Sequence, residues 1–136
     1  MFNLKPELVA RLERVLTSVE MLLPRPTAPV DWSVCHAASW RRHSFSGYLE
    51  PVRQTDTVTL PELLGIEKQK EVMTNNTLQF LRGLPANNAL LWGARGTGKS
   101  SLVKALLNEY AAQGLRIVQV EKEDLIYLSE IFAAVE

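Results

Sequence analysis

The feature that most restricts how this chain can fold is the run GARGTGKS at residues 93–100. Three of its eight residues are glycine, and glycine loses more backbone entropy on folding than any other residue. The run suits neither a helix interior nor a strand, so it predicts a sharp turn in conformations that other residues avoid. It also matches G-x-x-x-x-G-K-S/T, the pattern of a phosphate-binding loop between a strand and a helix.

Each residue type in this loop has a mechanical reason. The glycines let successive N–H groups turn inward around an anion, at the positive end of the following helix. Lys99 is the candidate catalytic residue, because its ammonium group can reach the β- and γ-phosphates of a nucleotide. The Ser100 hydroxyl is the candidate metal ligand, since Mg²⁺ prefers hard oxygen ligands. The residues predicted to contact the phosphates are Gly93, Ala94, Arg95, Gly96, Thr97, Gly98, Lys99, Ser100 and Ser101.

The sequence on either side of the loop fits this interpretation. Residues 88–92 (NALLW) form a short apolar run that predicts a buried strand. After the loop, Leu102, Leu106 and Tyr110 share one helical face, and Gly114 predicts the end of that helix. Residues 115–120 (LRIVQV) predict a second buried strand. A strand, a helix and a strand in this order predict a right-handed parallel crossover.

Upstream of the loop the signals are mixed. Thr59, followed by Glu62, matches a capping box and predicts a short helix that ends near Gly65. A second helix is expected from Ile66 to Arg82. Residues 31–57 look irregular, with short strands expected only at 47–52 and 57–60.

Both ends of the chain predict helix. The N-terminal stretch carries apolar residues at three- and four-residue spacing from Leu4 to Leu22. We expect Pro24 and Pro26 to stop this helix. The final stretch, from residue 125 onward, looks like the start of another helix.

Composition limits the classes of partner. The 15 basic and 15 acidic residues give a formal net charge of zero, so no global field favours nucleic acid or an anionic membrane. We interpret Trp40, Arg41 and Arg42 as a local surface cluster, although aromatic and arginine side chains together can also stack on bases. Charges interrupt the apolar residues of the N-terminal stretch, which argues against a signal peptide or a membrane span and favours a cytoplasmic location.

On these residues, the segment from Leu60 to Leu128 resembles the start of an AAA+ ATPase core. More narrowly, it resembles an uncharacterised family of predicted bacterial AAA+ ATPases, and the resemblance is thinner from Trp40 to Val52. It implies an α/β fold: a partial P-loop NTPase parallel sheet with flanking helices, preceded by a small, mostly helical segment. Residues 1–58 would then be an accessory segment and residues 59–136 the front part of the core.

The resemblance also implies ligands and partners. ATP and Mg²⁺ would be the cofactors, and Gly65 and Ile66 would contact the base. From the sequence alone, Ile66 fits plain core packing equally well. A full-length protein of this kind would couple ATP hydrolysis to remodelling a macromolecular partner of unknown identity, by self-association into a ring.

Hydrolysis in an AAA+ core also needs an acidic pair, a polar sensor, an arginine finger and a lid. The best local candidates for the acids are Glu121, Glu123 and Asp124, which come one strand too early in the AAA+ order. We therefore expect the chain to bind ATP and to hydrolyse it little. Two alternatives stay open: a binding module that does not hydrolyse nucleotide, and a small kinase-type or GTPase-type enzyme.

Overall fold

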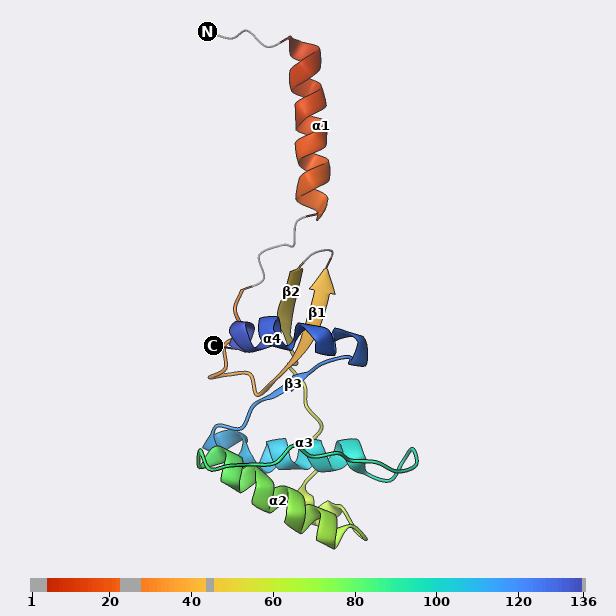
Figure 1. The fold of residues 1–136 in the computed structure, drawn as a ribbon, viewed down its shortest axis with the longest axis vertical. Helices are drawn as coiled ribbons and strands as arrows, with labels where there is room; N and C mark the ends of the chain where they lie inside the picture. Colours follow the sequence, from red (N-terminus) through yellow and green to blue (C-terminus); the bar gives the residue numbers. More distant parts are fainter. Residues whose placement is uncertain (1–4, 23–27, 44–45, 136) are drawn as a thin grey trace. The chain divides into compact units, whose positions relative to one another are not determined.

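The computed structural model describes residues 5–22, 28–43 and 46–135 and has a mixed α/β fold (Figure 1). In chain order the elements are α1 (Pro6–Leu22), β1 (Ala37–His43), β2 (Ser46–Pro51), η1 (Leu60–Glu62), α2 (Glu67–Leu81), α3 (Lys99–Tyr110), η2 (Ala111–Gln113), β3 (Ile117–Gln119), η3 (Lys122–Tyr127) and α4 (Leu128–Val135), where η marks a 3-10 helix. The strands form one mixed sheet in the order β2-β1-β3. The predicted α/β class is confirmed.

The chain divides into two compact units that interleave along the sequence. The first unit comprises Met1–Val30, Ser39–Glu50 and Val120–Glu136, and the second comprises Asp31–Ala38 and Pro51–Gln119. The boundary between residues 58 and 59 that the sequence suggests stays a prediction.

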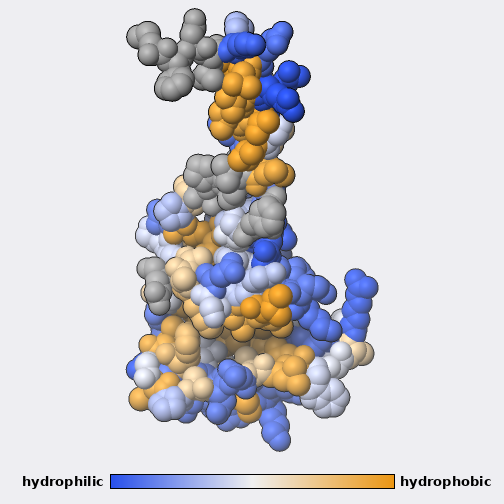
Figure 2. Space-filling view, turned by 45° about the horizontal axis from the view of Figure 1, so that its top comes forward, coloured by the Kyte–Doolittle hydropathy of each residue, from blue (hydrophilic) through white to orange (hydrophobic). Residues whose placement is uncertain are grey.

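In the first unit, α1 confirms the helix expected at the N-terminus. None of its described side chains is buried, and its apolar residues, including Leu12, Val15 and Leu16, are about half exposed. Figure 2 shows these apolar side chains along one side of the helix. Leu4, where the predicted apolar pattern begins, and Pro24 and Pro26, which were predicted to stop the helix, lie outside the described residues. In the part of the chain that the structure describes, no helix combines the length and apolarity needed to cross a bilayer.

Strand β1 shows that the interpretation of residues 31–57 was wrong in part. The strand expected at 47–52 is confirmed as β2, but β1 was missed. Trp40 is only 2% exposed, so the predicted surface cluster is wrong as well. The physical reason is that successive side chains of a strand point to opposite faces, so Trp40 and Arg42 share one face. On that face the Arg42 guanidinium lies 3.5 Å from the centroid of the Tyr127 ring. Arg41 instead pairs with Glu50 at 2.9 Å.

Gly47 leaves the space that the Trp40 indole occupies. A Cβ atom at Gly47 would lie 1.8 Å from Trp40 Cζ2. Because Trp40 is buried, it cannot move aside freely, and we expect Gly47→Ala to lower the free energy of unfolding by about 1–3 kcal/mol. Urea denaturation measures this loss. The same substitution made together with Trp40→Leu, which removes the ring, is expected to cost far less, and an equal cost in both backgrounds would contradict the packing described here.

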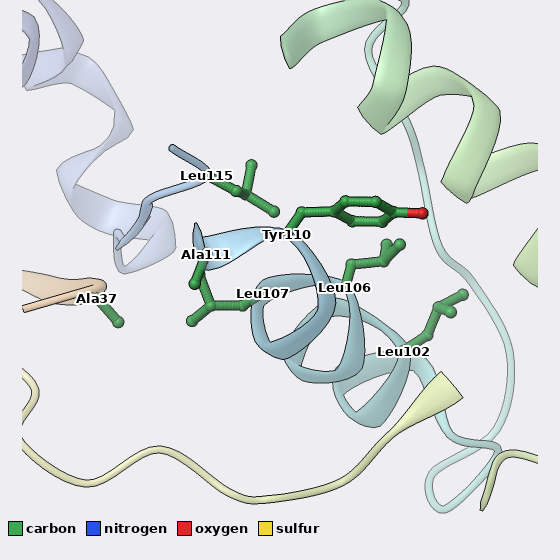
Figure 3. Packing of buried hydrophobic residues seen from close by; sticks show 7 residues of the cluster. All are labelled: Ala37, Leu102, Leu106, Leu107, Tyr110, Ala111 and Leu115. Atoms are coloured by element: carbon green, nitrogen blue, oxygen red, sulfur yellow. The ribbon is translucent and has the colours of Figure 1, made fainter. Parts of the chain in front are cut away.

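The core of the second unit is built on α3 and the turn that follows it. Its buried members are Ala37, Leu102, Leu106, Leu107, Tyr110, Ala111 and Leu115. Leu102, Leu106 and Tyr110 lie along one side of α3, as predicted, while Leu107 and Ala111 point toward Ala37 (Figure 3). Partly buried side chains of α2 also pack against this cluster. The helical stretch stops where expected, with Gly114 at φ 99°.

The turn before α2 follows the capping-box prediction. The Glu62 carboxylate accepts hydrogen bonds from the Thr59 amide at 2.6 Å and the Thr59 hydroxyl at 2.7 Å. These two bonds lower the pKa of Glu62, because they favour its charged form. The second predicted helix is confirmed as α2. The strand expected at 57–60 is wrong, since Leu60 already begins η1.

The largest error concerns residues 88–92, which form no strand. Leu90 and Trp92 are each 86% exposed. A strand needs a neighbour that satisfies its backbone N–H and C=O groups, and no described strand lies beside this run. Strand β3 pairs with β1 instead, next to a hydrogen bond from Ile117 N to His36 O of 3.1 Å. The predicted parallel crossover between 88–92 and 115–120 is therefore wrong. The helix predicted at the C-terminal end of the sequence is confirmed as α4, which begins at Leu128 directly after η3.

Candidate functional site

The glycine-rich loop lies directly before the first residue of α3. Gly93, Gly96 and Gly98 have φ angles of 138°, 84° and 83°. All three lie in the region of positive φ that favours glycine, and a Cβ atom there would be strained. The backbone thus adopts the type of turn that the sequence predicts, although residues 88–92, directly before the turn, form no strand.

The main-chain amides of this turn are free to bind a ligand. Within the described residues, none of the N–H groups from Gly96 to Ser101 donates a hydrogen bond to the protein. The first amide of the region with a partner is that of Leu102, which donates to Gly98 O at 2.8 Å. The first N–H groups of a helix lack intrahelical acceptors and carry the positive end of its dipole. They therefore form a donor set suited to an anion.

These amides border a hollow of about 440 Å³. Its lining residues are Gly93, Arg95, Gly96, Gly98, Lys99, Ser100 and Ser101. All seven belong to the predicted phosphate-binding set. Arg95 and Lys99 bring two positive charges, and none of the described residues that line the hollow carries a carboxylate, so its electrostatics favour an anion.

Lys99 makes three contacts inside the loop itself. Its Nζ atom donates to Gly93 O at 2.9 Å, to Ala94 O at 2.5 Å and to Thr97 Oγ1 at 3.1 Å. The Thr97 hydroxyl in turn donates to Ala94 O at 2.9 Å. The ammonium group thus lies over the beginning of the loop and is already held close to the hollow.

The candidate metal ligand lies in the first turn of α3. Ser100 is exposed and lines the hollow, and its hydroxyl makes no hydrogen bond to the described residues. A single hydroxyl suits Mg²⁺, which keeps several waters and takes few protein ligands. The acidic candidates Glu121, Glu123 and Asp124 belong to the other unit, at the beginning of η3. Among the described residues, no group of three or more His, Cys, Asp or Glu side chains is placed to hold a metal.

A second hollow, of about 370 Å³, adjoins the loop. Its lining residues are Ile66, Gln69, Leu90, Leu91, Trp92, Gly93, Thr97, Gly98, Lys99 and Leu102. It shares Gly93, Gly98 and Lys99 with the first hollow, so the two spaces meet at the loop. Ile66 lies beside the loop, since its Cδ1 atom is 4.0 Å from the point where a Cβ on Gly98 would sit.

Of the two residues predicted to contact the base, Ile66 and Gly65, only the first lines a hollow beside the loop. Ile66 lines the second hollow, whereas Gly65 lines neither hollow and has a φ angle of 78° at the entry to α2. Sequence reasoning missed Gln69 and Trp92. A signal for Gln69 existed, because residues three apart on a helix share a face and Ile66 had been singled out.

A larger hollow of about 740 Å³ lies between α2 and residues 87–91. The two sides are tied by Asn76, whose amide donates to Asn87 O at 2.7 Å and accepts from Asn87 N at 2.8 Å. No predicted site residue lines this space. Gln69 borders both this hollow and the second one.

Comparisons with known proteins give one matching family and two partial relatives. The model of the family described as "Protein of unknown function (DUF815)" matches residues 33–136. Among curated proteins, the chain is similar to the replication factor C large subunit of Nanoarchaeum equitans, with 30% identity over 73 residues, and to that of Ignicoccus hospitalis, with 43% identity over 51 residues. These segments cover 54% and 36% of the chain but only 17% and 11% of the two relatives. No solved structure matches the chain.

Proposed function

The chain belongs to this family, which is related to AAA+ ATPases, and we propose that it binds Mg-ATP at the loop of residues 93–100. The observation that carries the proposal is the set of unpaired amides from Gly96 to Ser101 beside the ammonium group of Lys99. A triphosphate offers charged oxygens to both, and charge-assisted hydrogen bonds are about twice as strong as neutral ones.

On binding, the phosphates would replace loop carbonyl oxygens as hydrogen-bond acceptors of the Lys99 ammonium group. In the structure its Nζ atom donates to the carbonyl oxygens of Gly93 and Ala94. Phosphate oxygens are stronger acceptors for an ammonium group than neutral carbonyls. The β-phosphate would lie on the amides at the beginning of α3, and the ammonium group would bridge the β- and γ-phosphates. Arg95 adds a positive charge at the rim of the same hollow.

The residues present fit one metal ion bound together with the nucleotide. Ser100 would supply one oxygen ligand, and phosphate oxygens and water would supply the others. The metal ion would neutralise charge on the phosphates when bound. The base would enter the neighbouring hollow and lie against the Ile66 side chain, with Gly65 shaping the chain at the entry to α2.

We further propose that a longer protein containing this chain is an ATPase that remodels a macromolecular partner as a ring. The relation to AAA+ ATPases supports this proposal. A second candidate is a module that binds nucleotide without hydrolysing it. It is favoured by the lining of the phosphate hollow, in which no described carboxylate is placed to polarise a water molecule.

Calorimetric titration with a non-hydrolysable ATP analogue tests the proposal. We expect the wild-type chain to bind the analogue and Mg²⁺ to tighten binding. Ser100→Ala should remove most of this tightening, about tenfold for one lost ligand, and leave the binding measured in EDTA intact. Ser18→Ala is a matched control, because its hydroxyl contacts only Arg14 O on α1. No binding by the wild-type chain would refute the proposed function, and an unchanged Mg²⁺ effect in Ser100→Ala would remove the metal role of that residue.

A further inference from the structure

We infer that Gln69 hydrogen-bonds to the edge of the base of the bound nucleotide. This inference rests on the proposed function and adds to it a side chain that contacts the base. The reason is the position of Gln69 in the hollow beside the loop, one helical turn after Ile66. Ile66 directly precedes α2, Gln69 lies in its first turn, and both side chains border the same space.

The hollow is mainly apolar. Ile66, Leu90, Leu91 and Leu102 supply aliphatic walls, and Trp92 supplies an aromatic ring. Such a lining suits the faces of a flat heterocycle, which lose little by leaving water. The space shares the lining residues Gly93, Gly98 and Lys99 with the phosphate hollow, so it is the neighbouring hollow that the base of a nucleotide bound at the loop would enter.

Few polar groups remain to recognise the edge of a base. Lys99 and the Thr97 hydroxyl are already bonded to oxygen atoms of the loop. The Trp92 indole nitrogen can only donate. The Gln69 amide makes no hydrogen bond to any described residue, and it carries both donors and an acceptor. Among the described side chains that line the hollow, Gln69 is therefore the one without a protein partner that can pair with a donor and an acceptor together.

Adenine presents this combination. Its N6 amino group is a donor that lies beside the acceptors N1 and N7, and an amide side chain pairs with such an edge through two hydrogen bonds. The Watson–Crick edge of guanine carries the acceptor O6 beside the donor N1–H, so an amide side chain can pair with either purine. A carboxylate in place of the amide can only accept. It would oppose N1 and N7 of adenine, whereas the N1–H and N2–H groups of guanine would donate to it.

This difference between an amide and a carboxylate gives a test of the contact. Gln69→Glu should lower the ATP-to-GTP affinity ratio roughly tenfold or more, as expected for one two-bond contact to a base. Gln69→Ala should weaken ATP binding several-fold without any gain for GTP. Competition titrations on the full chain measure all of these affinities.

Two controls make the test specific. Gln79→Glu makes the same change on the same helix, at a residue that lines only the larger hollow, and should leave the ratio unchanged. Inorganic tripolyphosphate has no base, so Gln69→Ala should bind it as the wild-type chain does. An equal loss of tripolyphosphate and ATP binding, or an unchanged ratio in Gln69→Glu, would overturn the inference. A wild-type chain that binds neither nucleotide would refute the proposed function itself.

Discussion

Replacing Lys99 with alanine is expected to abolish nucleotide binding by the chain. The substitution removes the only ammonium group that lines the phosphate hollow in the described part of the chain. A hydrogen bond to a charged group contributes about 1.5–3 kcal/mol, and Lys99 would make such bonds to two phosphates. We therefore expect the affinity for a non-hydrolysable ATP analogue to fall about 100-fold or more, measured by calorimetry.

The matched control is Lys104→Ala. Lys104 lies on the same helix, but it pairs with Asp56 and does not line the hollow. The control removes the same charge and should leave the affinity within about twofold, since exposed pairs contribute little. If Lys99→Ala kept the wild-type affinity, the assignment of the phosphate site to this loop would be wrong. Circular dichroism before each titration shows whether both variants keep their helices.

Leu102→Ala is expected to cause the largest loss of stability. Leu102 lies in the core of the second unit and is only 2% exposed. Truncation of such a leucine removes apolar burial and leaves a cavity, which together cost about 2–5 kcal/mol. The loss should appear as a lower urea midpoint with little change in the slope of the transition.

Leu64→Ala is the control for this measurement, because it makes the same chemical change at a side chain that is 83% exposed. It should alter the free energy of unfolding by less than about 0.5 kcal/mol. Equal effects of the two substitutions would mean that the core of the second unit is not organised around α3.

The parts of the fold that the sequence predicts well depend on local signals. The glycines of the loop, the apolar face of α3 and the stop at Gly114 act through the backbone and neighbouring residues alone. The capping residues Thr59 and Glu62 likewise meet within a single turn. The residues that line the hollow at the loop are close in sequence, and all of them belong to the set predicted from the motif and the serine that follows it.

The errors arise where structure depends on distant partners. Residues 88–92 have the composition of a buried strand, but composition does not show whether a neighbouring strand exists. Strand β1 was missed for the opposite reason. Its arginines suggest a surface, but Arg42 covers the Tyr127 ring, which is far away in the sequence. The spacing of Gln69 from Ile66 put both residues on one side of the predicted helix, but only the opposite wall, residues 90–92, makes that side part of a hollow.

The pair of hydrogen bonds between Asn76 and Asn87 has a mechanical consequence. A carboxamide carries the same donor and acceptor as a peptide group, so Asn76 engages the main chain at Asn87 much as an adjacent strand would. Helix α2 is thereby fastened to the stretch that leads into the glycine turn. A displacement of α2 would therefore also displace residues 87–92, so the two walls of the hollow between them move together.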